Sequence, residues 1–477
     1  MRYVLRFFVA TLVLTSARDE VFVGETEQDV VKVIQATLEC RHVPGMTVGI
    51  FKENDTWTRG FGTADLKSGR PVDEDTLFNI GSVTKSFTMA LLAIMLKENK
   101  LQWTAKISDI LGSEYGFIDD YRTRETTLRD LLSHRTGLAS PDIGFMAGFP
   151  SSISREDLCK LHPAEPAGAI LSSAEDMVRY FQFVLNNGNT TTGDQLTDPK
   201  LFSEAFSAAI PVNREKVTVS KPTFPISDVQ VGYGSAWFES SYDGYRAVWH
   251  SGALWSYITL VWLFPETNIG IFISTNGGMF KDYQSKSLTT TMYFLADILL
   301  DKEPWLNSST ACSFPLPWKE VNETDPRLTE IPAFLPDISE YAGIYGNEFQ
   351  PDFILTVSGS SQTQLNFESG IIGGNLYSTQ DKERFLMEIT YPWEFYVPLT
   401  DHNNVTTKTN VTFVREVGTV TSMILNFGTN ITYTKDVSIL DVISRNTNGS
   451  CRLFSAAWLI VYLLATCVVW LKYNQRI

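Results

Sequence analysis

The sequence has few cysteines, few histidines and a shortage of basic residues. Five cysteines and five histidines are spread over 477 residues, and they show no CxxC or His/Cys spacing, so no metal site is predicted. Lys and Arg number 39 against 54 Asp and Glu, which gives a net charge of -15. Because nucleic-acid backbones repel a chain of this sign, nucleic-acid binding is disfavoured as a function.

Low-complexity tracts and internal repeats are absent as well. Hydrophobic residues make up 44% of the chain and aromatic residues 12%, which is enough for a large buried core and excludes a disordered or collagen-like chain. The length allows roughly three structural units. The acidic excess is compatible with an extracellular surface and with association with calcium or an extracellular matrix.

The two ends of the chain carry long apolar runs. Residues 1–17 combine Arg2 with an apolar run over Phe7–Leu14 and a small-residue end, which is the layout of a secretory signal peptide. Residues 453–471 hold no charged residue and, at about 1.5 Å per residue, nearly cross a hydrocarbon core about 30 Å thick. They predict a transmembrane helix followed by a cytoplasmic tail at 472–477. A buried core helix and a lipid-anchor signal are the alternatives.

N-glycosylation triplets agree with an extracellular body. The N-x-[ST] triplets begin at Asn54, Asn189, Asn307, Asn322, Asn404, Asn410, Asn430 and Asn448. Outside the C-terminal segment, Cys40, Cys159 and Cys312 allow at most one disulfide among them. We therefore expect the secretory pathway, with the chain either a single-pass type I membrane protein or a secreted or matrix protein after shedding.

Helix and strand patterns alternate between about residues 25 and 300, the first predicted domain. Ser86–Leu96 is apolar on most sides, which is typical of a helix buried between layers. Ser173–Leu185 also predicts a helix, because Ser173 is followed by two acidic residues of a first turn. Strands are predicted at 48–51 and 56–60, and as antiparallel neighbours at 247–249, 257–264 and 270–275.

The composition changes after residue 300. Prolines are frequent over residues 301–336, which predicts an interdomain linker. Residues 337–437 then contain short alternating strands, at 354–357, 364–367, 385–389, 411–415, 420–427 and 431–433. Their spacing predicts a small antiparallel barrel or sandwich.

The segment Phe78–Phe87 holds the first candidate for chemistry. Ser82 stands at the start of the expected buried helix, where unpaired N–H groups and the helix dipole favour negative charge. Lys85 follows three residues later on the same face. A desolvated lysine is neutral at pH 7 and takes a serine proton, so this S-x-x-K pattern predicts an activated serine nucleophile. For an isolated match, the alternative is a capping serine and a surface lysine.

Three further segments accompany this pattern. They are Leu131–Leu138 (LLSHRTGL), Pro166–Met177 (PAGAILSSAEDM) and the triplet His250-Ser251-Gly252. Together the four segments resemble the motifs of serine hydrolases of the β-lactamase/D-alanyl-D-alanine carboxypeptidase type, the class C β-lactamase-related peptidase group, in its animal, gigasin-like form. The resemblance covers about residues 29–300, and the region from about residue 341 resembles the lipocalin-like appendage of related members.

The resemblance implies an α+β fold with a β-lactamase/transpeptidase-like domain, built from an antiparallel sheet and a truncated helical subdomain, then a lipocalin-like barrel and the membrane helix. It implies that Ser82 is the acylated nucleophile and Lys85 its proton acceptor. The N–H groups of Ser82 and of Ala253, beside Gly252, would form the oxyanion hole. His250 would contact a substrate carboxylate or the Ser–Lys pair. No cofactor and no metal are implied.

The chain departs from this family at the Tyr-x-Asn motif, whose tyrosine shares a proton with the lysine. The 28 residues between Leu138 and Ala167 contain neither Tyr nor Asn. Loss of a proton-transfer group typically lowers a rate by about 10²–10⁴-fold, so a slow or inactive enzyme is expected. Lys160 and His162 lie near the gap, but only proximity supports them as substitutes, and His134 is expected to brace a loop.

Two function classes follow. The first is a membrane-tethered serine hydrolase that acts on a peptide, amide or ester through an acyl-serine. The second is a non-catalytic glycoprotein of the same fold, for example an acidic shell-matrix (biomineral) component, which the net charge of -15 and the missing tyrosine favour. In either case, His-x-Gly in place of the family's Lys-Thr-Gly removes a fixed cation from the cleft. This argues against substrates that carry a penicillin-like carboxylate.

Overall fold

The computed structural model describes residues 21–22, 24–112, 117, 119–136, 168, 170–211, 223–254, 257–277, 283–318, 337–347, 351–359, 361–370, 372–391, 409–426 and 430–441. The predicted signal peptide, transmembrane helix and cytoplasmic tail lie outside these residues, as do Cys159, Asn322, Asn404 and Asn448. None of the helices within these ranges is both long enough and apolar enough to cross a membrane.

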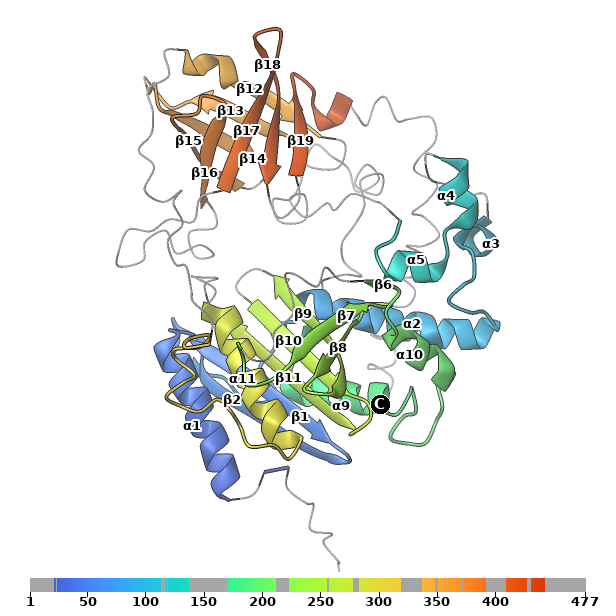
Figure 1. Ribbon diagram of the computed structural model, residues 1–477. Coiled ribbons are helices and arrows are strands. Elements are labelled where there is room, and N and C mark those ends of the chain that lie inside the picture. The colour runs from blue at the N-terminus through green and yellow to red at the C-terminus, as the bar shows by residue number, and fades with distance from the viewer. Residues whose placement is uncertain are drawn as a thin grey trace, which may run out of the picture.

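A nine-stranded antiparallel sheet organises the first part of the chain (Figure 1). Its strands run in the order β3-β2-β1-β11-β10-β9-β8-β7-β6. The predicted strands of this region are confirmed, and β9, β10 and β11 are antiparallel neighbours as expected. The bounds are β1 Gly45–Lys52, β2 Asp55–Asp65, β3 Arg70–Pro71, β6 Ile210–Pro211, β7 Asp228–Tyr233, β8 Phe238–Tyr242, β9 Tyr245–Leu254, β10 Tyr257–Phe264 and β11 Ile269–Asn276.

The sheet is buried on both faces. In β11, Ile271 and Ile273 belong to one hydrophobic core, whereas Phe272 between them belongs to the other. Successive side chains of a strand point to opposite faces, so the continuous apolar runs of β10 and β11 serve two cores at once. One core contains α1 (Glu25–Cys40) and α11 (Tyr283–Leu299), and the other contains α2 (Thr84–Asn99), α9 (Ala174–Leu185) and α10 (Pro199–Phe206).

The two predicted helices are confirmed. α2 extends the expected run by a few residues, and its positions Met89, Ala93 and Leu96 are buried in the second core. α9 begins after Ser173, whose hydroxyl accepts a hydrogen bond from the backbone of Asp176 and so caps the helix. The described helices between them are short: α3 Ile107–Leu111, α4 Asp120–Glu125 and α5 Leu128–Leu132.

Residues 301–318, which we expected to belong to a linker, instead pack in the first core. Leu306 and Phe314 are buried there. Cys312 forms a disulfide with Cys40 at the end of α1, and the two Cα atoms are 5.8 Å apart. Proline content marked this stretch as irregular, which it is, but did not reveal that its apolar side chains are buried. The rest of the expected linker lies outside the described residues.

A closed antiparallel barrel of eight strands forms the second part. Six of its strands coincide with predicted ones, whereas β12 and β15 were not predicted. β15 escapes the alternation pattern because it contains Gly373 and Gly374; at the latter, a Cβ would come within 2.0 Å of Glu388 O. The bounds are β12 Gly343–Gly346, β13 Phe353–Val357, β14 Gln364–Ser369, β15 Ile372–Ser378, β16 Arg384–Tyr391, β17 Thr409–Glu416, β18 Thr419–Asn426 and β19 Asn430–Lys435.

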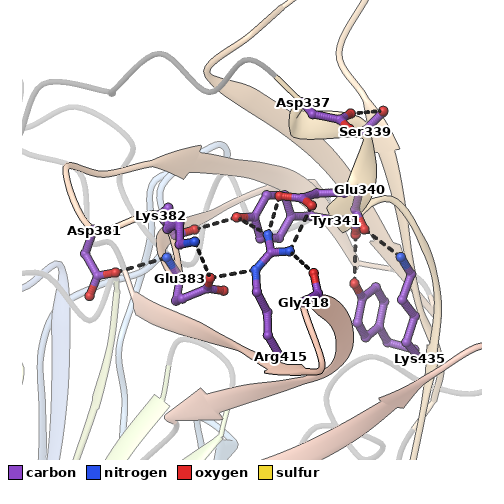
Figure 2. Close-up of polar contacts among 11 residues, drawn as sticks. Asp337, Ser339, Glu340, Tyr341, Asp381, Lys382, Glu383, Arg415, Gly418 and Lys435 are labelled. Atoms are coloured by element: carbon purple, nitrogen blue, oxygen red, sulfur yellow. Dashed lines mark hydrogen bonds and ion pairs between the residues drawn. The ribbon is translucent and has the colours of Figure 1, made fainter.

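Arg415 of β17 ties together the barrel end at which β12 and β16 begin (Figure 2). Its guanidinium donates to the carboxylates of Glu383 and Glu340 and, at 2.8 Å, to the hydroxyl of Tyr341. Glu340 and Tyr341 belong to η6 (Ile338–Tyr341), the short helix before β12. The planar fork of arginine therefore joins segments that are distant in sequence, which is a structural use of this cluster.

Candidate active site

Ser82 and Lys85 are brought together as predicted. Ser82 lies in η1 (Gly81–Val83), the 3-10 turn that leads directly into α2, and Lys85 lies in the first turn of α2. Lys85 Nζ donates a hydrogen bond to Ser82 Oγ at 2.8 Å. Both side chains are half-buried, so the hydroxyl and the amine are partly shielded from water and still open to a substrate.

The segment before α9 holds the turn of Ser82 in place. β5 (Leu171–Ser172) pairs with β4 (Phe78–Asn79), the two-residue strand that precedes η1. The backbone of Ile170 continues this pairing, because its carbonyl accepts from Ile80 N at 3.1 Å and its N–H donates to Thr84 Oγ1 at 3.2 Å. The segment with the PAGAILSSAEDM pattern therefore clamps the start of the nucleophile helix.

Tyr180 of α9 braces α2 from a second direction. Its ring stacks on Phe87 with centroids 3.8 Å apart, and its hydroxyl donates to Ser86 Oγ at 3.1 Å. Ser86 in turn donates to the carbonyl of Val83 at 2.8 Å. Burial raises the pKa of Tyr180 far above its ordinary value. Tyr180 is thus a structural brace and does not take the place of the missing motif tyrosine.

Strand β9 passes the turn of Ser82 at backbone distance. A Cβ atom on Gly252 would come within 1.9 Å of Ile80 O and 3.0 Å of Ser82 N, and one on Gly81 would come within 2.6 Å of Ala253 N. Only glycine permits this approach. The backbone N–H groups of Ser82 and Ala253 consequently belong to two segments in direct contact, an arrangement that suits the donors of an oxyanion hole.

The same stretch of β9 reaches beyond its neighbour β8. The last residue pair between the two strands is Phe238 with Trp249, so residues 250–254 pair only with β10 among the described strands. Ser251 and Ala253 are exposed. This free edge contacts the turn of Ser82 through Gly252 and Ala253.

His250 is buried, with 6% of its surface exposed, and both of its ring nitrogens are engaged. Nδ1 lies 2.5 Å from the carbonyl oxygen of Ser251, and Nε2 lies 3.2 Å from the hydroxyl of Tyr233. A carbonyl only accepts, so Nδ1 carries the proton. Burial lowers the pKa of His250 to about 4, and the charge of Lys85 acts in the same direction. The ring is therefore neutral at pH 7, and Nε2 accepts from Tyr233.

This neutral ring bears on the role expected for His250. Its nitrogens are directed at Ser251 and Tyr233, and it carries no positive charge at neutral pH. It consequently provides no cation for a substrate carboxylate. It stands at the start of the free edge of β9, near enough to Lys85 for the lysine charge to act on its ring.

The sequence did not point to Tyr233, and it indicated only a loop-bracing role for His134. Tyr233 is buried at the end of β7, and the ring of His134 lies 5.4 Å from its ring. Partial burial and then the charge of Lys85 lower the pKa of His134. The available signal in the sequence was the pair of glycines, Gly232 and Gly234, on either side of Tyr233. The structure explains them, because a Cβ on either would come within 2.5 Å of a backbone oxygen.

Two further predictions concern metal binding and glycosylation. Within the described ranges no three His, Cys, Asp or Glu side chains are grouped to hold a metal ion. Five glycosylation triplets fall on described residues: Asn54, Asn307 and Asn430 are exposed, and Asn189 and Asn410 are half-buried.

Comparison with known proteins gives a family match. Residues 30–149 and 144–287 match the family model described as Beta-lactamase. A protein named unguisins hydrolase from Aspergillus campestris is 37% identical over 134 residues, which are 27% of this chain and 25% of that protein. A beta-lactamase from Yersinia enterocolitica is 43% identical over 67 residues, 13% of this chain and 17% of that protein. The match thus spans a quarter or less of the length of these relatives.

Solved structures show lower similarity. The octameric penicillin-binding protein homologue from Pyrococcus abyssi has a TM-score of 0.44 and 16% identity, over 86% of this chain and 100% of that chain. A class C beta lactamase from Rhodobacter sphaeroides has a TM-score of 0.39 and 15% identity, over 56% of this chain and 99% of that chain.

Proposed function

Because this chain belongs to the beta-lactamase family, we propose that it is a serine hydrolase of the class C β-lactamase/carboxypeptidase type that cleaves a peptide, amide or ester through an acyl-serine. The observation that carries the proposal is the 2.8 Å contact between Lys85 Nζ and Ser82 Oγ. The backbone of Ala253, in contact with the same turn, adds the second element that acyl transfer needs.

The proposed reaction has two acyl-transfer steps. In the form that reacts, Lys85 is the neutral amine, and it takes the proton of Ser82 while Oγ bonds to the substrate carbonyl carbon. The oxyanion that forms accepts hydrogen bonds from the N–H groups of Ser82 and Ala253, each worth about 2.7–4 kcal/mol of barrier in comparable sites. The lysine ammonium then protonates the leaving amine or alcohol as its bond to carbon breaks. Water then bonds to the acyl carbon while the amine of Lys85 takes one of its protons, and the resulting ammonium protonates Ser82 Oγ as the acyl bond breaks.

The charge of the site favours substrates without a carboxylate beside the scissile bond. His250 occupies the place where Lys-Thr-Gly members have a cation, and it is neutral at pH 7. An anionic group would therefore leave water without a compensating positive partner at this position. We propose a neutral amide or ester as the bond that is cleaved.

A serine-directed acylating probe tests the nucleophile. The full-length chain is incubated with a fluorophosphonate probe beside Ser82→Ala and, as a matched control, Ser68→Ala at an exposed turn. We expect labelling of the wild type and the control and no labelling of Ser82→Ala. Equal labelling of all three forms would remove Ser82 as the nucleophile.

A non-catalytic glycoprotein, such as an acidic shell-matrix component, is the second candidate. The net charge of -15 and the lack of Tyr and Asn between Leu138 and Ala167 favour it. Two results together would support this candidate over the hydrolase. The full chain would bind calcium in calorimetry, and it would show no Ser82-dependent turnover of generic esters and amides.

For the location we propose the secretory pathway, with the body outside the cell and anchored by residues 453–471 or shed. The Cys40–Cys312 disulfide supports an oxidising compartment, and the exposed triplet at Asn54 is open to glycosylation. We expect endoglycosidase treatment of the protein from secreting cells to increase its mobility on a gel, with a smaller change for Asn54→Gln. Mobility that does not respond to the enzyme would contradict this location.

A further inference from the structure

The free edge of β9 poses a problem of backbone pairing. In an antiparallel strand, residues two apart present their backbone groups to the same side. Ala253 N lies against Gly81 on the side of the Ser82 turn, so the backbone groups of Ser251 face that side as well. No strand is paired there among the described residues, so the Ser251 carbonyl is available to a side-chain donor.

His250 provides that donor from the neighbouring position. Its Nδ1–H group donates to the Ser251 carbonyl oxygen at 2.5 Å. This bond holds the peptide unit that joins Ser251 to Gly252, in addition to the pairing of this stretch with β10. The Ala253 N–H group belongs to the next peptide unit, so a shift of the His250 ring would change its direction.

Tyr233 determines the position of that ring. Its hydroxyl donates to His250 Nε2 at 3.2 Å, and this contact is buried. The ring of Phe238 packs against both partners, with centroids 4.6 Å from Tyr233 and 5.6 Å from His250. The hydrogen bond needs an unprotonated Nε2, so it favours the neutral ring with the proton on Nδ1.

We propose that Tyr233 is a positioning residue for the acyl-transfer site: through His250 and the Ser251 carbonyl, it orients the edge of β9 that carries the Ala253 N–H group. The proposal rests on the proposed function in assigning the Ala253 N–H group to the oxyanion hole. The chain of contacts from Tyr233 to Ser251 does not depend on that assignment.

The variant Tyr233→Phe tests the proposal, because it removes only the hydroxyl and retains the ring that packs on Phe238 and His134. Tyr242→Phe is the matched control: Tyr242 is also a buried tyrosine, its hydroxyl donates to Asp297 at 2.9 Å, and it lies at the opposite end of β8 from Phe238. Thermal unfolding of both variants measures how much each loses in stability.

The first readout is independent of activity. In the full chain labelled with ¹⁵N-histidine, the signals of His250 are identified by their loss in His250→Gln. We expect the wild type and Tyr242→Phe to hold the neutral Nδ1–H tautomer down to about pH 5, because the pKa of His250 is about 4. In Tyr233→Phe the pKa should rise by about one unit, since a bond to the neutral form is lost.

The second readout is kinetic. With the acylating probe, or with an ester that the wild type cleaves, Tyr233→Phe should lower the acylation rate constant about 10-fold and leave KM within about 2-fold, as loss of an outer-shell partner does. Tyr242→Phe should leave both unchanged. His250 in the Nε2–H tautomer in the wild type, or equal His250 pKa values in wild type and Tyr233→Phe, would overturn the proposal. If Tyr233→Phe does not fold, the tautomer of the wild type alone decides.

The two readouts also separate this proposal from the proposed function. A wild type that the probe does not label at Ser82 argues against the hydrolase, while the titration of His250 still tests the contacts of Tyr233. A labelled wild type with unchanged His250 titration and unchanged acylation in Tyr233→Phe retains the hydrolase and overturns the positioning role.

Discussion

The amine of Lys85 and the hydroxyl of Ser82 form a hydrogen bond of 2.8 Å between the first turn of α2 and the 3-10 turn before it. The spacing of three residues places them on one face of the helix. β4, β5 and β9 hold the turn from outside, so this pair is supported by segments from three regions of the chain.

Loss of the amine should slow acylation. In Lys85→Met the hydroxyl of Ser82 loses the amine that would accept its proton, and the rate of labelling by the acylating probe should fall by about 10²–10⁴-fold. Time-resolved labelling of the full chain measures this rate. Lys97→Met, on an exposed position near the end of the same helix, should label like the wild type. A Lys85→Met protein that labels at the wild-type rate would exclude lysine as the base.

A methyl group on Gly252 should separate β9 from the turn of Ser82. Its Cβ would lie 1.9 Å from Ile80 O, so either β9 or the turn of Ser82 must move. This movement would increase the distance between the N–H groups of Ser82 and Ala253. We expect Gly252→Ala to lose acylation by about 10²-fold or more, the effect of removing one such donor. Labelling and thermal unfolding measure the two effects. Gly373→Ala in the barrel, where the nearest contact is 3.3 Å, should leave labelling unchanged.

Asp228 should make the protein less stable as the pH rises. Burial raises its pKa to about 6, although Tyr293 donates to it at 2.9 Å. The pKa of this carboxyl is thus higher in the folded state than its ordinary value of 3.8. Such a group stabilises the folded protein at low pH, and this contribution is lost as the pH rises through about 6.

Asp228→Asn retains an oxygen that accepts from Tyr293 and cannot ionise. Relative to the wild type, it should therefore gain stability between about pH 4 and pH 6, and above pH 6 the gain should level off at about 1–3 kcal/mol. Thermal unfolding across this range measures the difference between the two proteins. Asp301→Asn, whose side chain is 90% exposed, should show no such change. A constant difference at all pH values would contradict the expected titration of Asp228.

Arg415 should be essential to the barrel. Its side chain is only 16% exposed and is paired with Glu340 and Glu383, so Arg415→Met removes the arginine from both carboxylates and leaves Glu383 with the exposed Lys382 at 3.9 Å. Removing one member of a buried pair costs about 3–5 kcal/mol, and the partial exposure of the glutamates should reduce this to about 2–3 kcal/mol. Chemical denaturation measures it. Lys382→Met, at a side chain that is 68% exposed, should cost little, and an equal loss in both would show that the fork contributes nothing specific.

Local patterns in the sequence predicted much of the fold. The short apolar runs of β10 and β11, the apolar run of α2 and the serine cap of α9 each depend on residues close in the chain, so a short window contains the signal. β12 and β15 were missed because short or glycine-containing strands lack alternation, and residues 301–318 were assigned to a linker because their burial depends on α1 and α11.

The sequence alone determined the pairing of Ser82 with Lys85, because a separation of three residues in a helix brings two side chains to one face. The tertiary structure decided the rest of the site. Tyr233, His134 and His250 come from three separate segments, and their contacts exist only because the sheet brings the ends of β7 and β9 beside the loop after α5. The neutral charge of His250 is likewise a property of its burial, which no pattern of neighbouring residues specifies.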